Sequence, residues 1–182
     1  MLYIMRHGRT DWNELHKLQG RTDIPLNEEG REMARQAAAR YRDVHLDVCY
    51  CSPLLRAKET AEILLDGRGI PIIPDDRLKE MSFGIYEGVQ DSFQIPDCPI
   101  NVFFKEPAAY KAVEGGESFE ELFARTGSFL KEKVEPELKE NKDVLIVGHG
   151  AMNSSIICQI RDIPLERFWE EGIENCRLIK LL

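Results

Sequence analysis

Short apolar runs alternate with segments in which apolar residues recur at helical spacing. This pattern predicts strands connected by helices along most of the chain. The expected strands cover residues 2–5, 46–52, 70–74, 143–150 and 176–182. The expected helices cover residues 28–41, 53–65, 119–134 and 151–161. Such alternation favours an α/β fold of three layers, a sandwich with a mainly parallel sheet and helices on both of its faces.

Three of the helix starts carry recognisable capping signals. Asn27 has the side chain of an N-cap and precedes two glutamates that suit the first turn of a helix. Ser52 is expected to cap a helix that has Pro53 at its first position. Ser118 and Glu121 form a capping-box pattern that starts the helix following them.

Residues 76–117 interrupt the alternation. They contain several prolines, a Gly-Gly pair and many aromatic residues, so we expect an irregular, partly helical excursion within a single domain that spans residues 1–182. Most of the rings are expected to pack in the core or a lid, and one or two to face a ring of the substrate. The rings belong to Phe83, Tyr86, Phe93, Phe103, Phe104 and Tyr110. Whether residues 89–113 form a mobile lid stays open.

Composition narrows the classes of protein. The formal net charge of −8 over 182 residues disfavours general binding to nucleic acid or anionic membranes, although a local basic pocket stays possible. No apolar run approaches the roughly 18 residues of a membrane span, and residues 1–20 lack a signal-peptide core. The five cysteines include no CxxC pair, and Cys49 and Cys51 are expected on one face of a strand. We therefore expect buried free thiols and a cytoplasmic protein.

Chemistry-bearing residues follow the predicted strands. Arg6 and His7 end the first strand, Arg56 follows the second, and His149 lies near the end of the strand over residues 143–150. In a parallel sheet the carboxyl ends of the strands share one edge, and ligands bind there. Cationic and titratable groups from three segments are therefore expected to meet at the same rim.

Paired imidazoles with arginines suit phosphoryl transfer. A neutral imidazole is a nucleophile toward phosphorus, nearby guanidinium groups disfavour its protonation, and arginine offers paired donors to phosphate oxygens. A zinc site is a weaker interpretation, because the arginines would repel a dication and no carboxylate stands at ligand spacing. A serine or cysteine nucleophile lacks its usual motif.

The order of the motifs is similar to that of the histidine phosphatase superfamily, which contains cofactor-dependent phosphoglycerate mutases and many small phosphatases. The resemblance covers nearly the whole chain apart from residues 89–113 and the tail. Its motifs are MRHGRT (5–10) followed by Trp12 and Asn13, GRTDIPLNEEG (20–30), SPLLRAKETA (52–61), LKEMSFGIYEG (78–88), GGESFEEL (115–122) and VGHG (147–150).

This resemblance implies roles for five residues. His7 is expected to be the nucleophile that becomes phosphohistidine. Arg6, Arg56 and a cationic His149 are expected to hold the phosphoryl oxygens. Glu80 is expected to protonate the leaving oxygen and then to accept a proton from the attacking water.

The resemblance also implies four substrate-binding positions. Asn13 is expected to donate to the phosphate, Gln19 and Gly20 to line the entrance, and Gly150 to lie against the bound group. Arg21 stands where relatives often have an aromatic residue, so the entrance would suit an anionic or polar group of the substrate.

Glu87 competes with Glu80 for the role of acid. The family pattern places the acid two residues after a leucine, here Leu78, which favours Glu80 and leaves Glu87 as a structural residue. The arginines favour an ionised Glu80, so an acid role requires partial burial or a proton shared with bound substrate.

Some residues are expected outside the chemistry or stay undecided. His16 and His45 are expected at the surface, and Trp12 is expected to pack the loop. Arg9 and Arg21 are divided between solvated charges and substrate contacts.

Together these observations predict a metal-independent phosphomonoesterase without a cofactor. Its partner would be a small phosphorylated metabolite, such as the alpha-ribazole phosphate of cobalamin-pathway phosphatases, or a broad range of phosphate esters. A mutase is the first alternative, although mutases of the family are typically longer, with segments that close the site. A non-catalytic phosphate-binding regulator is the second, although it would not need Glu80. Monomer and homodimer both stay open.

Overall fold

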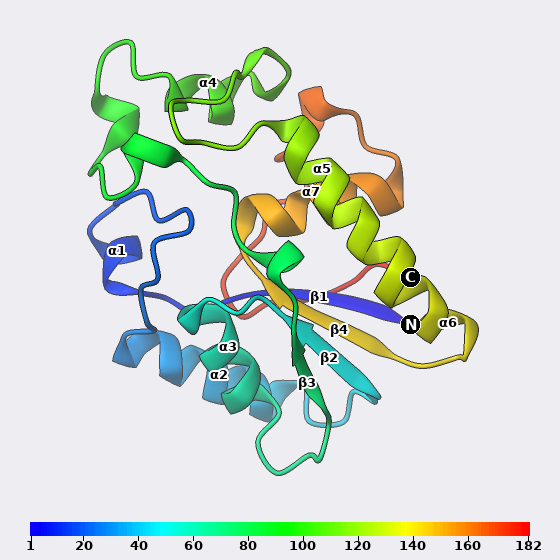
Figure 1. Ribbon diagram of the computed structural model, residues 1–182. Coiled ribbons are helices and arrows are strands. Elements are labelled where there is room, and N and C mark those ends of the chain that lie inside the picture. The colour runs from blue at the N-terminus through cyan, green and yellow to red at the C-terminus, as the bar shows by residue number, and fades with distance from the viewer.

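The computed structural model describes residues 1–182 apart from the side chain of residue 93, and within that range five strands form one sheet in the order β3-β2-β4-β1-β5 (Figure 1). Strands β1 and β4 run parallel, as do β2 and β4 and β2 and β3, whereas β5 is antiparallel to β1. The strands are β1 (Leu2–Arg6), β2 (Val48–Cys51), β3 (Ile72–Pro74), β4 (Val144–Gly148) and β5 (Leu178–Lys180).

The helices connect these strands or cover the faces of the sheet. They are α1 (Asp11–Glu14), α2 (Glu28–Arg40), α3 (Leu55–Leu64), α4 (Ile100–Lys105), α5 (Phe119–Phe129), α6 (Glu135–Lys139) and α7 (Gly150–Arg161). Short 3-10 turns cover Asp76–Leu78, Gly84–Tyr86, Ser92–Gln94, Pro107–Ala109 and Leu165–Arg167. Between residues 76 and 117 the backbone therefore consists of such turns, α4 and connecting loops.

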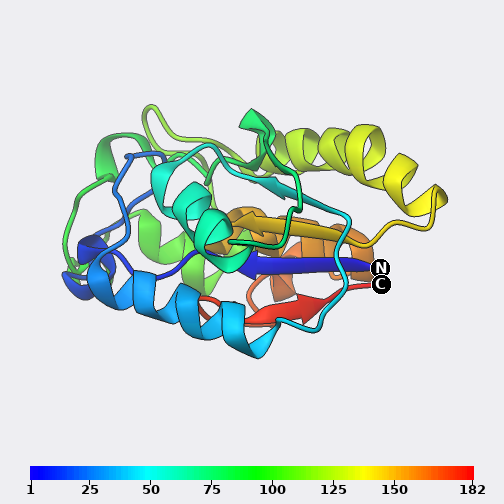
Figure 2. The same ribbon diagram turned by 90° about the horizontal axis from the view of Figure 1, so that it is seen from below.

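Apolar side chains on the two faces of the sheet form two separate cores. On one face, Ile4 and Ile146 pack with residues of α5 and α7. On the other face, Met5, Leu145 and Val147 pack with the small residues of α2 and α3. Figure 1 shows these helix layers on either side of the strands, and Figure 2 views the molecule from below. The three-layer α/β prediction is confirmed.

The cysteines follow the sequence-based expectation. Cys49 and Cys51 belong to the same core, on the face covered by α2 and α3. All five thiols are buried and free of disulfides within the described part of the chain. None of the helices described there is long and apolar enough to cross a membrane.

The predicted cap of the second helix is wrong. Helix α3 begins at Leu55 rather than Pro53, and the Ser52 hydroxyl accepts from Leu54 N–H at 3.3 Å within a turn. The carboxylate of Asp23 instead accepts from Leu55 N–H at 2.7 Å. A residue from another loop thus satisfies the helix terminus, so local sequence could not identify the cap.

The helix predicted over residues 119–134 also differs. Helix α5 starts after the Ser118 capping box, as expected, but a π-helical turn over Leu130–Val134 joins it to α6. Pro136 has no N–H to donate to a carbonyl one turn earlier, and the wider turn accommodates this missing bond.

Candidate active site

The ends of β1 and β4 bring the two predicted histidines together. His7 N–H donates to Gly148 O at 2.9 Å, so the strands stay paired as they reach the rim. The rings of His7 and His149 lie with their centroids 5.2 Å apart. Gly150 then starts α7, which places a helix N-terminus beside both rings.

Hydrogen bonds around His7 assign its tautomer. Its Nδ1 lies 2.6 Å from Gly8 O, a carbonyl that can only accept, so Nδ1 carries the proton. Its Nε2 accepts from Arg56 Nε at 3.3 Å and so keeps its lone pair. Burial lowers the pKa of His7 well below its ordinary value, and Arg56 and Arg6 lower it further. The ring is therefore neutral at physiological pH, with Nε2 as its nucleophilic atom.

Arg56 extends from α3 and is almost wholly buried. Its Nη1 donates to Thr22 O at 2.9 Å and its Nη2 to Gly20 O at 2.6 Å. These bonds aim Nε at His7. Burial lowers the pKa of Arg56 to about 10, which leaves the guanidinium charged at neutral pH.

Arg6 approaches from the end of β1. Its Nη1 donates to Ile173 O at 3.1 Å, whereas its buried Nε has no hydrogen-bond partner among the described residues. Burial lowers the pKa of Arg6, and the charge of Glu80 opposes that shift.

His149 has a different environment from His7. Both of its ring nitrogens are buried without a hydrogen-bond partner in the described part of the protein. Burial lowers the pKa of His149 well below its ordinary value, with further lowering by Arg56, His7 and Arg6. The expected cationic form of His149 concerns the ring with a phosphoryl group beside it, and it stays a prediction. Buried polar atoms without partners are rare in proteins, and those of His149 and Arg6 indicate a binding site for an anion.

Glu80 lies beside these cations at the start of α7. Its Oε1 accepts from Met81 and Met152 N–H at 2.8 and 2.9 Å, and its Oε2 from Ala151 N–H at 3.1 Å. These amides, two of them at the N-terminus of α7, fix the position of the carboxylate.

Glu87, the rival acid, has a different set of contacts. Its carboxylate accepts from the N–H groups of Arg21 and Thr22 at 3.0 and 2.9 Å and from Phe83 N–H at 3.1 Å. It therefore joins the loop after α1 to the segment after Glu80 and does not line the pocket.

Every predicted site residue except His149 lines one pocket of about 280 Å³. His149 is buried beside His7. Asn13 and Gln19 reach it from the loop around α1. The side-chain oxygens of both amides lie within hydrogen-bond distance of the Thr10 hydroxyl, at 3.1 and 2.9 Å. Thr10 therefore orients both amides, a role that we had not predicted for it.

Aromatic rings form much of the remaining pocket wall. They belong to Trp12, Phe83, Phe103, Phe104 and Trp169. Phe103 lies against Phe83, Phe104 and Trp169, with ring centroids 4.8 to 5.2 Å apart. Trp169 Nε1 donates to Phe103 O at 3.1 Å. Trp12 thus lines the pocket in addition to packing its loop. The side chain of Phe93 lies outside the described residues.

Two of the undecided cations lie away from the pocket. Arg9 pairs with Glu29 at the surface, at 2.7 Å. Arg21 pairs with Glu117 at 3.3 Å and donates to Glu80 O at 3.2 Å. Arg21, which the sequence left undecided between a solvated charge and a substrate contact, thus makes contacts within the protein. His16 is exposed, as predicted, and also reaches the pocket, as does Lys17.

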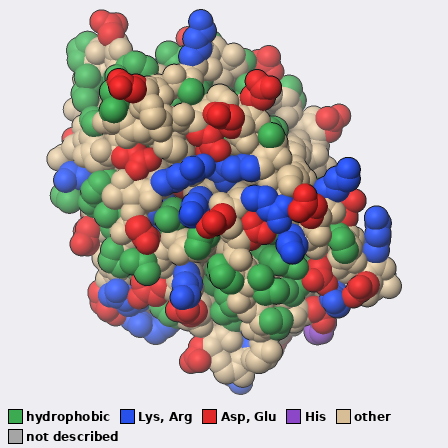
Figure 3. Space-filling model, viewed as in Figure 1, with side chains coloured by type: hydrophobic (Ala, Val, Ile, Leu, Met, Phe, Trp, Pro, Cys, Tyr) green, Lys and Arg blue, Asp and Glu red, His purple; other side chains and the backbone are tan. Residues whose placement is uncertain are grey.

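Basic side chains cluster on the surface of this chain despite its formal net charge of −8. Figure 3 shows Lys and Arg side chains gathered near the middle of one face, with acidic side chains around them.

Asn175, near the C-terminus, adds a further constraint on His7, because its Nδ2 donates to His7 O at 2.6 Å. No local pattern marks this asparagine, so its role was missed.

A possible metal-ligand cluster lies at the opposite edge of the sheet. His45, Asp47 and Asp143 have ligand atoms within 4.8 Å of one another and precede β2 and β4. The N-terminal amine pairs with Asp143 at 2.7 Å. This cluster is separate from the pocket, whose lining carboxylate is Glu80.

Comparison with known proteins agrees with the motifs. The model of the histidine phosphatase superfamily (branch 1) matches residues 2–182. A Bacillus subtilis (strain 168) protein named uncharacterized phosphatase PhoE is 38% identical over 157 residues, which cover 86% of this chain and 75% of the relative.

Solved structures are similar over almost the whole chain. YhfR of Bacillus stearothermophilus is 34% identical with a TM-score of 0.88, covering 97% of this chain and 88% of that one. The alpha-ribazole phosphatase of Shigella flexneri is 27% identical with a TM-score of 0.82, covering 97% and 87%.

Proposed function

Since the chain belongs to branch 1 of the histidine phosphatase superfamily, we propose that it hydrolyses small phosphorylated metabolites in two steps through a phosphohistidine on His7. Its enzyme class is that of the phosphoric monoester hydrolases. The observation that carries the proposal is the neutral His7 ring, whose Nε2 keeps its lone pair beside the buried Arg56 and Arg6.

In the first step, the phosphoryl oxygens accept hydrogen bonds from Arg56, Arg6 and Asn13. His7 Nε2 attacks phosphorus while the bond from phosphorus to the ester oxygen breaks. Glu80 gives its proton to that leaving oxygen, which departs as an alcohol. Positioned cations provide most of the stabilisation, because phosphoryl transfer depends mainly on charge and geometry.

In the second step, water attacks the phosphohistidine from the side that the alcohol has left. Ionised Glu80 accepts a proton from this water, the bond between phosphorus and Nε2 breaks, and inorganic phosphate forms. His7 recovers its lone pair and Glu80 its proton, so the cycle closes without a metal ion or cofactor.

Substrate binding changes the proton balance of the site. The negative charge of a phosphate raises the pKa of His149, so the ring becomes a cationic donor once the substrate is bound. The unpartnered nitrogens of His149 and Arg6 support this arrangement, because the phosphoryl oxygens would satisfy them.

The pocket walls support an ester whose leaving group carries an apolar ring. Phe83, Phe103, Phe104 and Trp169 surround the space beyond Glu80. Alpha-ribazole phosphate has such a ring, and broad activity toward ring-bearing esters fits the same walls. Measuring kcat/KM for a set of phosphorylated metabolites would identify the natural substrate.

The free buried thiols support a reducing, cytoplasmic setting for the protein.

The proposal is tested with p-nitrophenyl phosphate in EDTA. The unmodified enzyme is expected to release phosphate, and His7→Ala to lose at least about 10⁴-fold in kcat, because the nucleophile is gone. His45→Ala, at the opposite edge of the sheet, serves as the matched control and should retain full activity. Full activity of His7→Ala would remove the nucleophile assignment. Activity only with added divalent metal would replace this mechanism with a metal-dependent one.

A further inference from the structure

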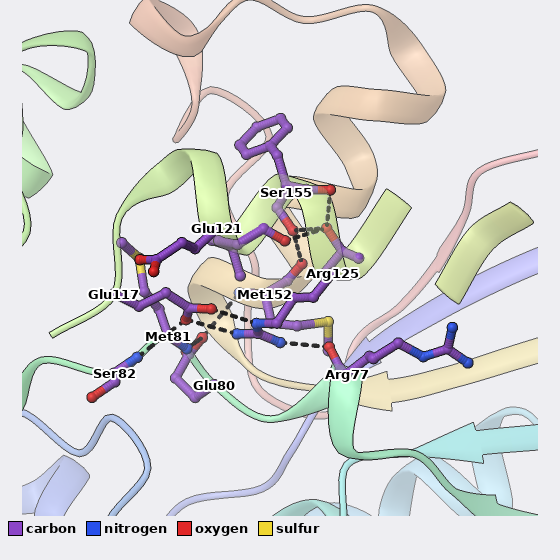
Figure 4. Close-up of polar contacts among 12 residues, drawn as sticks. Arg77, Glu80, Met81, Ser82, Glu117, Glu121, Arg125, Met152 and Ser155 are labelled. Carbon is purple, nitrogen blue, oxygen red and sulfur yellow. Dashed lines mark hydrogen bonds and ion pairs between the residues drawn. The ribbon is translucent and has the colours of Figure 1, made fainter. Parts of the chain in front are cut away.

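Beside Glu80 lies a group of charges, two of them largely buried, that does not line the pocket. Arg125 of α5 faces Glu117 through two bonds, from Nε at 2.6 Å and from Nη2 at 3.0 Å. Arg21 joins the same carboxylate at 3.3 Å. We call these three residues the Arg21–Glu117–Arg125 network. Figure 4 shows Glu117 and Arg125 side by side, next to Ser82 and Glu80.

The network holds the backbone on both sides of Glu80. Arg21 Nε donates to Glu80 O at 3.2 Å. Glu117 accepts from Ser82 N–H at 3.4 Å, and its own N–H donates to Ser82 O at 2.9 Å. Arg125 Nη1 donates to Arg77 O, at the other end of the same segment. Residues 77–82 are therefore fixed before, at and after the candidate acid.

Stability alone gives little reason to bury these charges. The Glu117 and Arg125 side chains are only 8% and 15% exposed. Desolvation of a buried ion pair offsets most of its attraction, and apolar residues of similar volume often stabilise a core as well. What apolar residues could not supply is a set of directed hydrogen bonds to the carbonyl and amide groups around Glu80.

We propose that the Arg21–Glu117–Arg125 network positions Glu80 for proton transfer to the leaving oxygen. This inference rests on the proposed function, in which Glu80 is the acid. The carboxylate is held from one side by the amides of α7 and from the other by the network acting through the Glu80 backbone. Its three members are positioning residues, because none of them lines the pocket.

The chemistry of the leaving group separates positioning from general structural support. p-Nitrophenolate is a weak base and departs with little help from an acid, whereas benzyl alkoxide requires a proton. Both substrates carry one ring and one phosphate. A misplaced Glu80 therefore slows hydrolysis of benzyl phosphate much more than that of p-nitrophenyl phosphate. A general loosening of the fold slows both equally.

The experiment compares kcat/KM for the two esters, because kcat/KM reports the step in which the leaving group departs. Arg21→Ala removes the bond to Glu80 O. Because the Arg21 side chain is 42% exposed, we expect this variant to fold. Arg125→Lys shortens the reach to Glu117. Each variant is expected to lose at least about 10-fold on benzyl phosphate and less than about 3-fold on p-nitrophenyl phosphate. Thermal unfolding confirms that each is folded.

Two reference variants make the outcome decisive. Glu80→Gln should show the same selectivity with a larger loss on benzyl phosphate. Glu137→Gln, which breaks a partly buried pair with Lys142 at the far end of the fold, should leave both rates unchanged. Equal losses on both esters in Arg21→Ala, or none on either, would overturn the positioning role. If Glu80→Gln itself lacked selectivity, the acid assignment would fail instead.

Discussion

The two buried imidazoles have different hydrogen bonds, and this difference separates their roles. His7 is held by a carbonyl at Nδ1 and accepts from Arg56 at Nε2, so its orientation is fixed and Nε2 is its unprotonated nitrogen. His149 has no such contacts among the described residues, so both of its ring nitrogens could meet the oxygens of a bound phosphoryl group. The contacts of His7 suit a nucleophile. Those of His149 suit a hydrogen-bond donor that becomes protonated when the substrate binds.

Arg56 offers a test of geometry at the scale of one residue. Its three nitrogens hold Gly20 O, Thr22 O and His7, and a lysine at this position has a single nitrogen. Arg56→Lys is expected to lower kcat/KM for p-nitrophenyl phosphate by about 10²–10³-fold, as for loss of one transition-state donor.

The control for this substitution is Arg68→Lys. Arg68 also donates to two backbone carbonyls, those of Tyr41 and Val44, but lies outside the pocket lining. Its replacement should leave kcat/KM unchanged. If kcat/KM fell by a similar factor in both variants, the effect would come from lost support of the backbone and not from the phosphate site.

At the scale of elements, the loop after β1 crosses the first turn of α2 at two glycines. A Cβ on Gly30 would lie 2.0 Å from Arg9 O, and one on Gly8 would lie 2.5 Å from Gly30 O. No side chain fits between these backbones. The crossing therefore determines how the segment that carries His7 leaves the sheet.

Gly30→Ala is expected to destabilise the fold by about 1–3 kcal/mol, as overpacking does, although alanine usually favours a helix over glycine. Urea unfolding measures the change, and activity should fall with it because the His7 segment must shift. Gly127→Ala in α5 is the matched control. Its Cβ would meet only the end of the Gln159 side chain, so stability should hold or rise. A neutral Gly30→Ala would show that the crossing is not tight.

Most elements, but not all of their ends, could be predicted from local patterns. The Asn27 and Ser118 caps lie where their side chains and spacing predicted them. The start of α3 differs because Asp23, distant in sequence, supplies the bond that Ser52 was expected to make. Local chemistry specifies a helix terminus only when the capping group is also local.

At the scale of the whole molecule, burial of two imidazoles makes stability depend on pH. In the unfolded chain their pKa returns to about 6.5, whereas burial keeps the pKa of His7 and His149 well below that value in the folded state. Below pH 6.5 the unfolded chain therefore binds protons that the folded protein does not. The free energy of unfolding should fall as pH falls, by up to about 2.7 kcal/mol per pH unit.

Urea titrations at pH 7.5, 6.5 and 5.5 in a phosphate-free buffer measure this slope. His149→Gln removes one of the two groups and should reduce the slope by about half. His45→Gln, at the exposed edge, controls for the loss of any histidine. If His149→Gln left the slope of the free energy of unfolding against pH unchanged, other groups would be responsible for the loss of stability at low pH.

The candidate site was predictable where its residues belong to short motifs, and it was not where contacts cross the chain. His7, Arg56 and Glu80 each stand in a recognisable stretch, and the structure brings them to one pocket. Arg21 stayed undecided between a solvated charge and a substrate contact, because its local sequence does not show which groups its guanidinium meets. Its partner Glu117 is far along the chain, so only the fold could redirect it toward Glu80.

The sheet order has a consequence for synthesis of the protein. Strand β1, which leads to His7, lies between β4 and β5, the two strands of this sheet that follow latest in the sequence. On the ribosome, β1 is made well before either of its neighbours and stays unpaired until β4 and β5 have been synthesised. Phosphatase activity therefore emerges late in biogenesis, and the nascent chain depends longest on protection from aggregation at its first strand.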